Sequence, residues 1–437
     1  MGVKYFGTDG VRGVAGAELT CELAFRLARA AGRAFRPQRV LLAQDTRLSG
    51  PALASACAAG LAEAGCDVDL AGVLPSPAVS HLVPRRGYGL GLVVSASHNP
   101  PQDNGVKLYG PHGLKLSPED EARVEALLDA PGGGGPPGAV RGWTGAEAEY
   151  AAVLRAAVPD LSLDGLKLVL DCAHGATAPL APPLFAEFGA DVTVISGDPD
   201  GARINETGAA AMAVLSREVP ARGAEIGIAF DGDGDRALFV DRRGMVVEGD
   251  QLLAALAPHL LAWGELSAPG VVFTVLANLG AEAYLREEGF RVERVPVGDR
   301  NVAWAMRERG SDLGGEPSGH IIFRRYAPTG DGILTALLVL RALARIGTDL
   351  ASLVAPVPVY PQVRADVPVA DREAALASPA VQAAIREVQA QLDGRGRLVV
   401  RPSGTQPLIR IMAEGPDVGA LRALVSRIAG EIAQEGR

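Results

Sequence analysis

The chain has 437 residues, of which 48% are hydrophobic and 21% are charged, and its formal net charge is −9. This length exceeds the roughly 250–300 residues at which a single hydrophobic core stops growing, so several domains are expected. The composition is that of a folded globular protein. The acidic balance argues against nucleic acids and anionic membranes as partners, because both require a basic face.

The cysteines show no Cys-x-x-Cys spacing, which argues against a metal site built on them and favours reduced thiols over disulfides. They are Cys21, Cys57, Cys66 and Cys172. The N-terminal segment has no apolar signal-like stretch, and no apolar run reaches the roughly 20 residues of a membrane-spanning helix. We therefore expect a cytoplasmic protein.

Apolar segments of strand length recur along the chain, and alanine-rich segments of helical period lie between many of them. The predicted strands are residues 39–45, 90–97, 166–171, 191–196, 225–231, 270–275 and 397–403. The predicted helices include residues 22–35, 52–65, 146–158, 178–189 and 250–263. Apolar strands alternating with helices predict α/β domains with mixed, mostly parallel sheets covered on both faces.

Glycine and proline suggest the domain boundaries. Residues 129–145 are predicted to form a surface loop, and they lack the Lys-Ser/Thr pair of a nucleotide-binding P-loop. Residues 354–371 contain spaced prolines and are predicted to be a linker into a smaller last unit. We predict four domains, comprising residues 1–158, 159–250, 251–355 and 356–437.

Each of the first three predicted domains ends a strand in a polar loop, at residues 97–100, 231–236 and 315–320. The loops are similar in layout, but they do not align as a repeat. Ligands of open α/β sheets gather at the carboxyl ends of strands, so the three loops are expected to face one cleft.

The first loop, Ser97-His98-Asn99-Pro100, is either a plain turn or a site of chemistry. A hydrolase pair is disfavoured, since neighbouring side chains at the end of a strand point to opposite faces. The glycines of a G-x-S-x-G elbow are also absent. The tetrapeptide alone favours the turn.

The second loop carries carboxylates at Asp231, Asp233 and Asp235. The two intervening glycines let these groups converge, and a carboxylate set without histidine or cysteine favours a hard cation such as Mg²⁺. The alternative is a solvated acidic turn, which is weakened by the repulsion among uncompensated carboxylates. An EF-hand is excluded because Arg236 and Arg242 stand where it needs glycine and glutamate. An aspartyl-nucleophile phosphatase would need threonine in place of Asp235.

Three further groups suit phosphate and sugar recognition. Arg236 follows the carboxylates and is suited to bind a phosphate on the same cation, with a surface ion pair as the alternative. Glu316 and Ser318 are candidate partners for vicinal sugar hydroxyls, although their motif alone is a weak signal. The segment "RPSGTQPLIR" indicates a metal-free phosphate cradle, with an ordinary turn as the alternative. The cradle residues are Arg401, Ser403, Gly404, Thr405 and Arg410.

A cation site and a separate phosphate cradle indicate a substrate with phosphate at both ends at some stage, with Ser97 as the phosphate carrier. These segments resemble the α-D-phosphohexomutases from end to end. The resemblance rests on "KYFGTDGVRG", "DTRLSG", "SASHNPPQDNGVK", "DCAHGAT", "DGDGDR", "VGDRNV", "GGEPSGH", "TGDGI" and "RPSGTQPLIRIMAEG". The opening segment, "DCAHGAT" and "ANLGAE" are similar to the branch that acts on glucosamine phosphates.

The resemblance implies four domains around a central cleft, the first three related α/β units and the fourth a smaller α+β phosphate-binding unit. It implies phosphorylation of Ser97 and one Mg²⁺ per chain, bound by Ser97, Asp231, Asp233 and Asp235. It also carries over four active-site residues, namely Arg12, His98, Lys107 and His320. The sequence does not decide which of the last three is the general acid or base.

The resemblance further implies interconversion of glucosamine 6-phosphate and glucosamine 1-phosphate through a 1,6-bisphosphate, feeding UDP-N-acetylglucosamine synthesis. The alternative substrates are the neutral hexose phosphates of a phosphomannomutase or phosphoglucomutase. A sugar-phosphate-binding regulator and a Mg²⁺-dependent phosphatase are the other rivals. Gln406, Pro317 and the Ala43-Gln44 pair depart from the family pattern, but none is a predicted phosphate or metal ligand. Small-molecule sugar phosphates are the expected partners, and the sequence leaves the oligomeric state open, a homodimer included.

Overall fold

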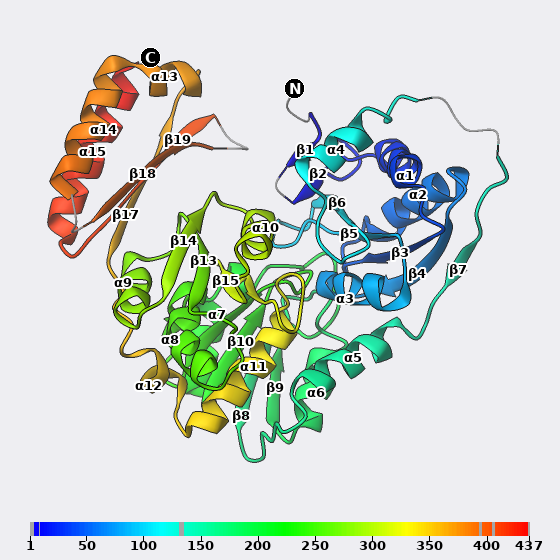
Figure 1. Ribbon diagram of the computed structural model, residues 1–437, viewed down its shortest axis with the longest axis horizontal. Helices are drawn as coiled ribbons and strands as arrows, with labels where there is room; N and C mark the ends of the chain where they lie inside the picture. The colour runs from blue at the N-terminus through cyan, green and yellow to red at the C-terminus, as the bar shows by residue number, and fades with distance from the viewer. Residues whose placement is uncertain (1–3, 8, 131–134, 393–395, 404–406, 436–437) are drawn as a thin grey trace. The chain divides into compact units, whose positions relative to one another are not determined.

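The computed structural model describes residues 4–7, 9–130, 135–392, 396–403 and 407–435. The chain divides into two compact units, described separately below and drawn with their element labels in Figure 1. Unit 1 comprises Met1–Thr274 and Phe290–Ala355, and unit 2 comprises Val275–Gly289 and Pro356–Arg437. In the described part of the chain, no helix has the length and apolar character that crossing a membrane requires.

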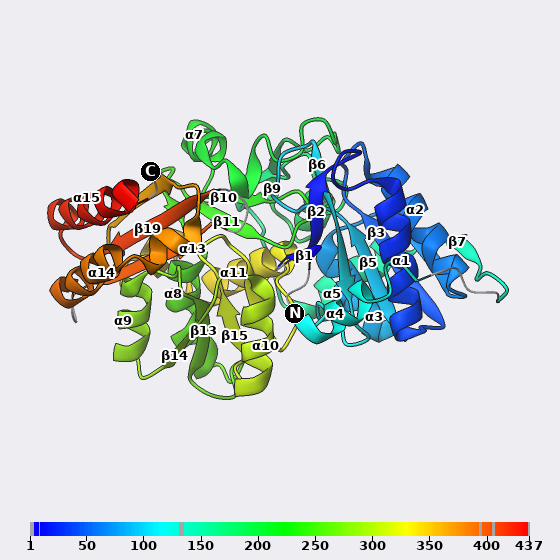
Figure 2. The same cartoon turned by 90° about the horizontal axis from the view of Figure 1, so that it is seen from above.

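The first sheet of unit 1 has seven strands in the order β1-β2-β6-β5-β3-β4-β7. The strands are β1 (Phe6–Gly7), β2 (Gly10–Val14), β3 (Arg39–Gln44), β4 (Asp67–Val73), β5 (Leu90–Val94), β6 (Asp103–Tyr109) and β7 (Val140–Gly142). Helices α1 (Cys21–Phe35), α2 (Gly50–Glu63) and α4 (Pro118–Glu125) share a core with one face of this sheet. Helix α3 (Ser76–Arg86) packs on the other face, as Figure 2 also shows.

Side chains along the central strands point alternately to the two faces of the sheet, and both faces are apolar, which explains why helices cover both. Leu90, Leu92 and Val94 of β5 belong to the core beneath α1 and α2. Gly91, on the opposite face, lies against α3 so closely that an added Cβ would stand 2.7 Å from Val79. All five residues of β5 are therefore buried, as expected for a strand in the middle of an α/β sheet.

The second sheet has the order β12-β11-β10-β8-β9, and the third has the order β14-β13-β15-β16. The second consists of β8 (Lys167–Asp171), β9 (Asp191–Ile195), β10 (Ile226–Phe230), β11 (Ala237–Asp241) and β12 (Val246–Val247). The third consists of β13 (Gly270–Thr274), β14 (Arg291–Val295), β15 (Leu313–Gly315) and β16 (Ile321–Phe323). The accompanying helices are α5 (Ala146–Ala157), α6 (Ala181–Glu187), η1 (Gly208–Ala210), α7 (Ala213–Ala221), α8 (Gly249–Ala262), α10 (Asp299–Arg309), α11 (Gly332–Ile346) and α12 (Leu350–Val354).

The three sheets of unit 1 share one strand arrangement. Each contains four neighbouring strands in which the first two pairs are parallel and the last pair is antiparallel. The orders are β4-β3-β5-β6, β9-β8-β10-β11 and β14-β13-β15-β16. In each sheet, one of the predicted polar loops is the turn that joins the antiparallel pair. The mixed α/β sheets predicted from the sequence are confirmed, and the similar layout of the loops has a topological cause.

Unit 2 contains a three-stranded antiparallel sheet in the order β17-β19-β18. Its strands are β17 (Gln362–Pro368), β18 (Arg397–Pro402) and β19 (Leu408–Glu414). Its helices are α9 (Leu279–Glu287), α13 (Arg372–Ala377), α14 (Pro379–Leu392) and α15 (Val418–Glu435). Alternate strand residues such as Val367, Ile409 and Ile411 share a core with residues of α13, α14 and α15. The small α+β unit predicted at the end of the chain is therefore present.

Two predictions for the connecting segments need correction. Residues 362–368, predicted as part of a linker, form β17, which pairs with β19 along its whole length. The one proline of β17, Pro368, is tolerated because β17 is an edge strand and needs partners on one side only. Residues 140–142, predicted as loop, form the short edge strand β7, which pairs with β4. The four domain boundaries remain a proposal.

Candidate active site

The turn between β10 and β11 gathers three carboxylates. Asp231, Asp233 and Asp235 are buried, and each offers an oxygen within 4.8 Å of the others. Gly234 has a φ of 73°, a left-handed conformation that lets the chain curl between the second and third carboxylates. The convergence expected from the alternating glycines is thus present in the structure.

The carboxylate turn fits a hard cation. Among the described residues, Asp233 Oδ1 and Asp235 Oδ1 are buried and accept no hydrogen bond. Burial, together with the charges of Asp235 and Asp233, raises the pKa of Asp231 to about 8. A divalent cation would offset this repulsion and satisfy the free oxygens, and an all-oxygen ligand set is the kind that Mg²⁺ prefers.

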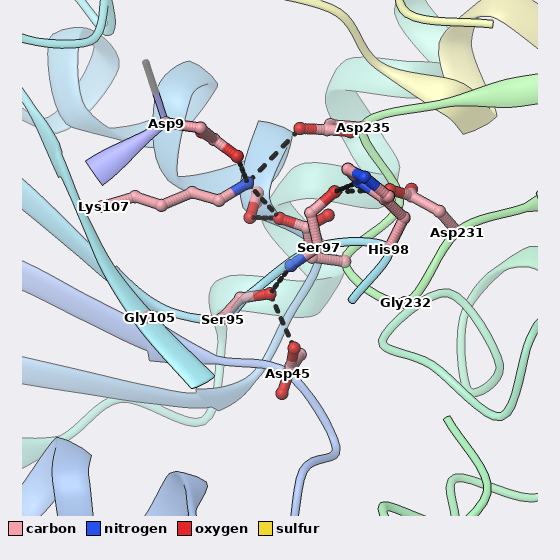
Figure 3. Close-up of polar contacts among 12 residues, drawn as sticks. Asp9, Asp45, Ser95, Ser97, His98, Gly105, Lys107, Asp231, Gly232 and Asp235 are labelled. Carbon is pink, nitrogen blue, oxygen red and sulfur yellow. Dashed lines mark hydrogen bonds and ion pairs between the residues drawn. The ribbon is translucent and has the colours of Figure 1, made fainter. Parts of the chain in front are cut away.

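Ser97 lies in the turn between β5 and β6, in direct contact with this cluster. Its Oγ donates a hydrogen bond to Asp231 Oδ2 at 2.7 Å (Figure 3). Its Oγ is also 3.3 Å from His98 Nδ1, so the expectation that the two side chains point to opposite faces is wrong. The reason is the backbone, since Ser97 has a φ of 51° and the alternation of an extended strand no longer applies.

Lys107, on β6, is fully buried among carboxylates. Its Nζ lies 2.6 Å from Asp233 Oδ2, 3.4 Å from Asp235 Oδ2 and 3.1 Å from Asp9 Oδ2 (Figure 3). Burial alone would lower the pKa of Lys107, but Asp233, Asp9 and Asp235 outweigh it and hold that pKa well above its ordinary value. Lys107 is therefore an ammonium group at neutral pH.

Two arginines border the Ser97 turn. Arg236 Nε lies 3.8 Å from Asp231 Oδ2 and 3.7 Å from Asp235 Oδ1, and Arg12 Nη1 donates to Asn99 Oδ1 at 3.1 Å. The charge of Arg236, then burial, then the charge of Arg12 lower the pKa of His98 to about 3. His98 is consequently neutral at physiological pH, and one of its ring nitrogens can accept a hydrogen bond.

The remaining predicted site residues of unit 1, Glu316, Ser318 and His320, lie in the third polar loop. His320 Nε2 accepts a hydrogen bond from Gly330 N at 3.1 Å, which leaves the proton on Nδ1, 3.7 Å from Asp235 Oδ1. Glu316 Oε1 accepts from Gly298 N at 3.2 Å. Ser318 Oγ is buried and has no hydrogen-bond partner within the described residues. An unsatisfied hydroxyl of this kind is suited to bind a ligand.

The predicted phosphate cradle lies in unit 2. Arg401 and Arg410 face each other across β18 and β19, on the sheet face away from the helices. They line a hollow of about 490 Å³ together with Arg364 and Asp366. Burial and the neighbouring charge of Arg410 lower the pKa of Arg401, an arrangement that a bound anion would relieve. Ser403 is buried at the end of β18, whereas the predicted cradle residues Gly404 and Thr405 lie outside the described residues.

Family models match nearly the whole chain in four consecutive parts. They are phosphoglucomutase/phosphomannomutase alpha/beta/alpha domain I at residues 3–132, domain II at 148–244, domain III at 248–360 and the C-terminal domain at 365–431. A phosphoglucosamine mutase of Geobacillus kaustophilus is 45% identical over 445 residues, covering 99% of both chains. The chain belongs to the α-D-phosphohexomutase family.

Further relatives agree with this assignment. A phosphoglucosamine mutase of Thermus thermophilus is 48% identical over 422 residues, covering 95% of this chain and 94% of that protein. The crystal structure of a phosphoglucomutase/phosphomannomutase family protein from Burkholderia thailandensis superposes with a TM-score of 0.82, at 27% identity and 98% coverage of both chains. An Aspergillus fumigatus N-acetylphosphoglucosamine mutase, crystallised with GlcNAc-6P and magnesium, has the same fold, with a TM-score of 0.71 at 19% identity and 100% and 96% coverage. The chain is thus a mutase, an enzyme of the isomerase class.

Sequence reasoning missed three charged residues of this phosphohexomutase site. Asp9 contacts Lys107, Arg12 and Lys115, and these cations outweigh burial and hold the pKa of Asp9 well below its ordinary value. Lys115 also pairs with Asp299, at the start of α10. Asp9 lies within the matched segment "KYFGTDGVRG", but nothing in the sequence pairs Lys115 with a residue 184 positions away.

A second cluster of potential ligands comprises Asp235, Asp299 and His320. Its oxygens and nitrogens are largely engaged already. Asp299 pairs with Lys115 and accepts from Arg300 N at 2.8 Å, while His320 Nε2 accepts from Gly330 N. The three-carboxylate turn is therefore the better candidate for a cation site.

Proposed function

We propose that this phosphohexomutase interconverts glucosamine 6-phosphate and glucosamine 1-phosphate, with phosphorylated Ser97 as the carrier. In the first half-reaction the bond between Ser97 Oγ and phosphorus breaks and phosphorus bonds to the oxygen of the free sugar hydroxyl. That hydroxyl gives up its proton and Ser97 Oγ gains one, and the reverse proton movements accompany the second half-reaction. The resulting 1,6-bisphosphate turns end for end. In the second half-reaction Ser97 Oγ takes the other phosphate, which restores the phosphorylated enzyme.

One observation carries this proposal: the 2.7 Å contact between Ser97 Oγ and Asp231 in a buried carboxylate cluster. Ser97, Asp231, Asp233 and Asp235 would hold one Mg²⁺, which would neutralise charge on the oxygens of the transferring phosphoryl group. Arg236 and Arg12 would donate to the same oxygens. At neutral pH Lys107 is charged and His98 is neutral, so Lys107 can donate hydrogen bonds to the substrate and His98 can accept one.

The amino-sugar substrate is supported by the relatives named phosphoglucosamine mutase, which are 45% and 48% identical to the chain. Glu316 and the unsatisfied hydroxyl of Ser318 would hold the sugar hydroxyls. The reaction would supply amino-sugar phosphate for UDP-N-acetylglucosamine synthesis. The proposed reaction is compatible with a homodimeric enzyme but does not require one.

Turnover of three sugar phosphates tests the substrate. We expect kcat/KM for glucosamine 6-phosphate to exceed the values for glucose 6-phosphate and mannose 6-phosphate. Equal or higher values for a neutral sugar would contradict the amino-sugar assignment and favour the phosphomannomutase or phosphoglucomutase alternative. Release of inorganic phosphate without isomer would indicate a phosphatase, and binding without turnover would indicate a regulator.

Replacing Arg410 with lysine should reduce kcat/KM for both monophosphate isomers. A planar guanidinium can grip two phosphate oxygens, whereas an ammonium is a single point charge. Losing one charge-assisted contact should cost on the order of 1.5–3 kcal/mol, or roughly 10- to 150-fold in kcat/KM. The measurement is steady-state kinetics in both directions, alongside the phosphoserine content by mass spectrometry, which should not change.

Arg427→Lys provides the matched control, since Arg427 is a half-exposed arginine of the same unit that pairs with Glu387 on α14. It should leave kcat/KM unchanged. If Arg410→Lys impaired only one isomer, the cradle would not alternate between the two phosphates, and the proposed turning of the intermediate would be wrong.

A further inference from the structure

The guanidinium of Arg47, from the segment "DTRLSG", binds backbone carbonyl groups of the Ser97 turn. Arg47 is buried, and its Nη2 donates to Ser97 O at 2.9 Å and to Asn99 O at 2.8 Å. Its Nη1 donates to Asp103 O at 2.8 Å and also to Pro100 O. One side chain thus satisfies four carbonyl groups of the turn, which fixes the path of the backbone between β5 and β6.

A second set of bonds holds Arg47 and the amide of Ser97. Arg47 Nε donates to Asp45 Oδ2 at 3.0 Å, and Ser95 Oγ donates to the same oxygen at 2.6 Å. Ser97 N in turn donates to Ser95 Oγ at 2.9 Å, as Figure 3 shows. The left-handed backbone at Ser97 is unfavourable for a residue with a Cβ and persists because its surroundings over-determine it.

Asn205 lies in the loop between β9 and η1, beside the second sheet, and binds the same turn. Its Nδ2 donates to Ser97 O at 2.8 Å and to Asn99 O at 2.9 Å, the two carbonyls that Arg47 Nη2 also binds. Its Oδ1 accepts from Gly232 N at 2.8 Å. Asn205 has a φ of 66°, a conformation that asparagine tolerates better than most residues.

Gly232 separates Asp231 from Asp233 and leaves no room between the two turns. A Cβ added at Gly232 would stand 2.8 Å from Asn205 Nδ2 and 2.8 Å from Ser97 O. The Ser97 turn, the Asn205 amide and the carboxylate turn are therefore packed in direct succession. A shift of one turn relative to the other would break the hydrogen bonds at one end or the other of the Asn205 side chain.

We propose that Asn205 is a positioning residue that holds the Ser97 turn in register with the carboxylate turn, using Arg47 as the fixed support behind Ser97. The side chain of Asn205 binds backbone groups of the two turns, namely Ser97 O, Asn99 O and Gly232 N. It acts on the reaction by keeping Ser97 Oγ within hydrogen-bond distance of Asp231. Its kinetic consequence rests on the proposed function, whereas its effect on the two turns does not.

The test is Asn205→Gly, which accepts the left-handed backbone and removes all three hydrogen bonds. Hydrogen exchange by mass spectrometry should become faster in the peptides containing residues 95–104 and 229–236. Thr46→Val is the matched control, because it removes one hydrogen bond, from Thr46 Oγ1 to His174 O at 2.7 Å, between the same two parts of unit 1. Exchange in the two turns should stay unchanged in that control.

Kinetics separates positioning from general destabilisation. We expect Asn205→Gly to lower kcat roughly 10- to 100-fold, as other losses of supporting residues do, and to raise the Mg²⁺ concentration for half-maximal activity. The KM for glucosamine 6-phosphate should change by less than about threefold, since the sugar contacts remain. Thr46→Val should keep kcat within about twofold of wild type.

Unchanged exchange in both turns, or a kcat of Asn205→Gly equal to that of Thr46→Val, would overturn the inference. If Asn205→Gly fails to fold, Asn205→Asp replaces it, because the carboxylate keeps the acceptor for Gly232 N and loses the donors to Ser97 O and Asn99 O. That variant should speed exchange in residues 95–104 alone, and unchanged exchange there would equally overturn the inference. If wild-type protein fails to turn over glucosamine 6-phosphate, the proposed function is wrong, and the exchange experiment still decides the role of Asn205.

Discussion

Ser97→Ala should abolish mutase activity while leaving the protein folded. The hydroxyl is the proposed carrier, so its removal eliminates the covalent step and not merely a contact. The fold loses the contacts of the Ser97 hydroxyl with Asp231 and His98, each worth about 1 kcal/mol, and hence a few degrees in Tm. Isomer formation, Tm and intact mass are the measurements, and wild type should carry a phosphate that the variant lacks.

Ser80→Ala is the matched control for this experiment. Ser80 is a buried serine on α3 whose hydroxyl binds a backbone carbonyl, that of Gly113. Its removal should cost similar stability and leave turnover and phosphate content unchanged. Near-normal turnover by Ser97→Ala would show that another group carries the phosphate.

Asp233→Asn should weaken Mg²⁺ binding and cost activity steeply. The change neutralises one of three clustered carboxylates and removes the nearest partner of Lys107, at 2.6 Å. We expect metal affinity to fall by more than the roughly 10- to 100-fold that the loss of a ligand-supporting residue costs. The measurement is Tm as a function of Mg²⁺ concentration, because a cation that binds only the folded state raises its stability by mass action.

The metal-free variant need not be much less stable than wild type, since removing one carboxylate also removes repulsion from its two neighbours. Asp241→Asn serves as the control, because Asp241 is a buried aspartate at the end of β11 that binds Arg243 and the backbone of its own turn. It should keep the Mg²⁺ dependence of wild type. Full wild-type activity in the presence of excess EDTA would contradict the metal assignment.

The sequence predicted the elements and loops of the site because their signals are local. The apolar strands around residues 39–45, 90–97 and 225–231 are present, and the loops that follow the last two lie together in unit 1. The spacing of Asp231, Asp233 and Asp235 was enough to predict a carboxylate cluster, since two glycines make the turn tight.

What the sequence missed depends on tertiary contacts or on backbone geometry. Lys115 meets Asp299 only because α10 is brought next to the segment after β6. Asn205 sits in a loop with no recognisable motif, and its role appears only when the distances to Ser97 O and Gly232 N are known. The contact of Ser97 with His98 was missed because alternation assumes an extended backbone, which Ser97 does not have.

The most direct test of the account follows one phosphate through a single turnover. Protein labelled on Ser97 with radioactive phosphate, by exchange with labelled sugar 1,6-bisphosphate, is mixed with excess unlabelled glucosamine 6-phosphate and quenched at successive times. The proposed mechanism predicts that the label leaves Ser97, appears first in glucosamine 1,6-bisphosphate and is then recovered in the monophosphate product. Label that stayed on the protein while isomer formed, or that left as inorganic phosphate, would contradict it.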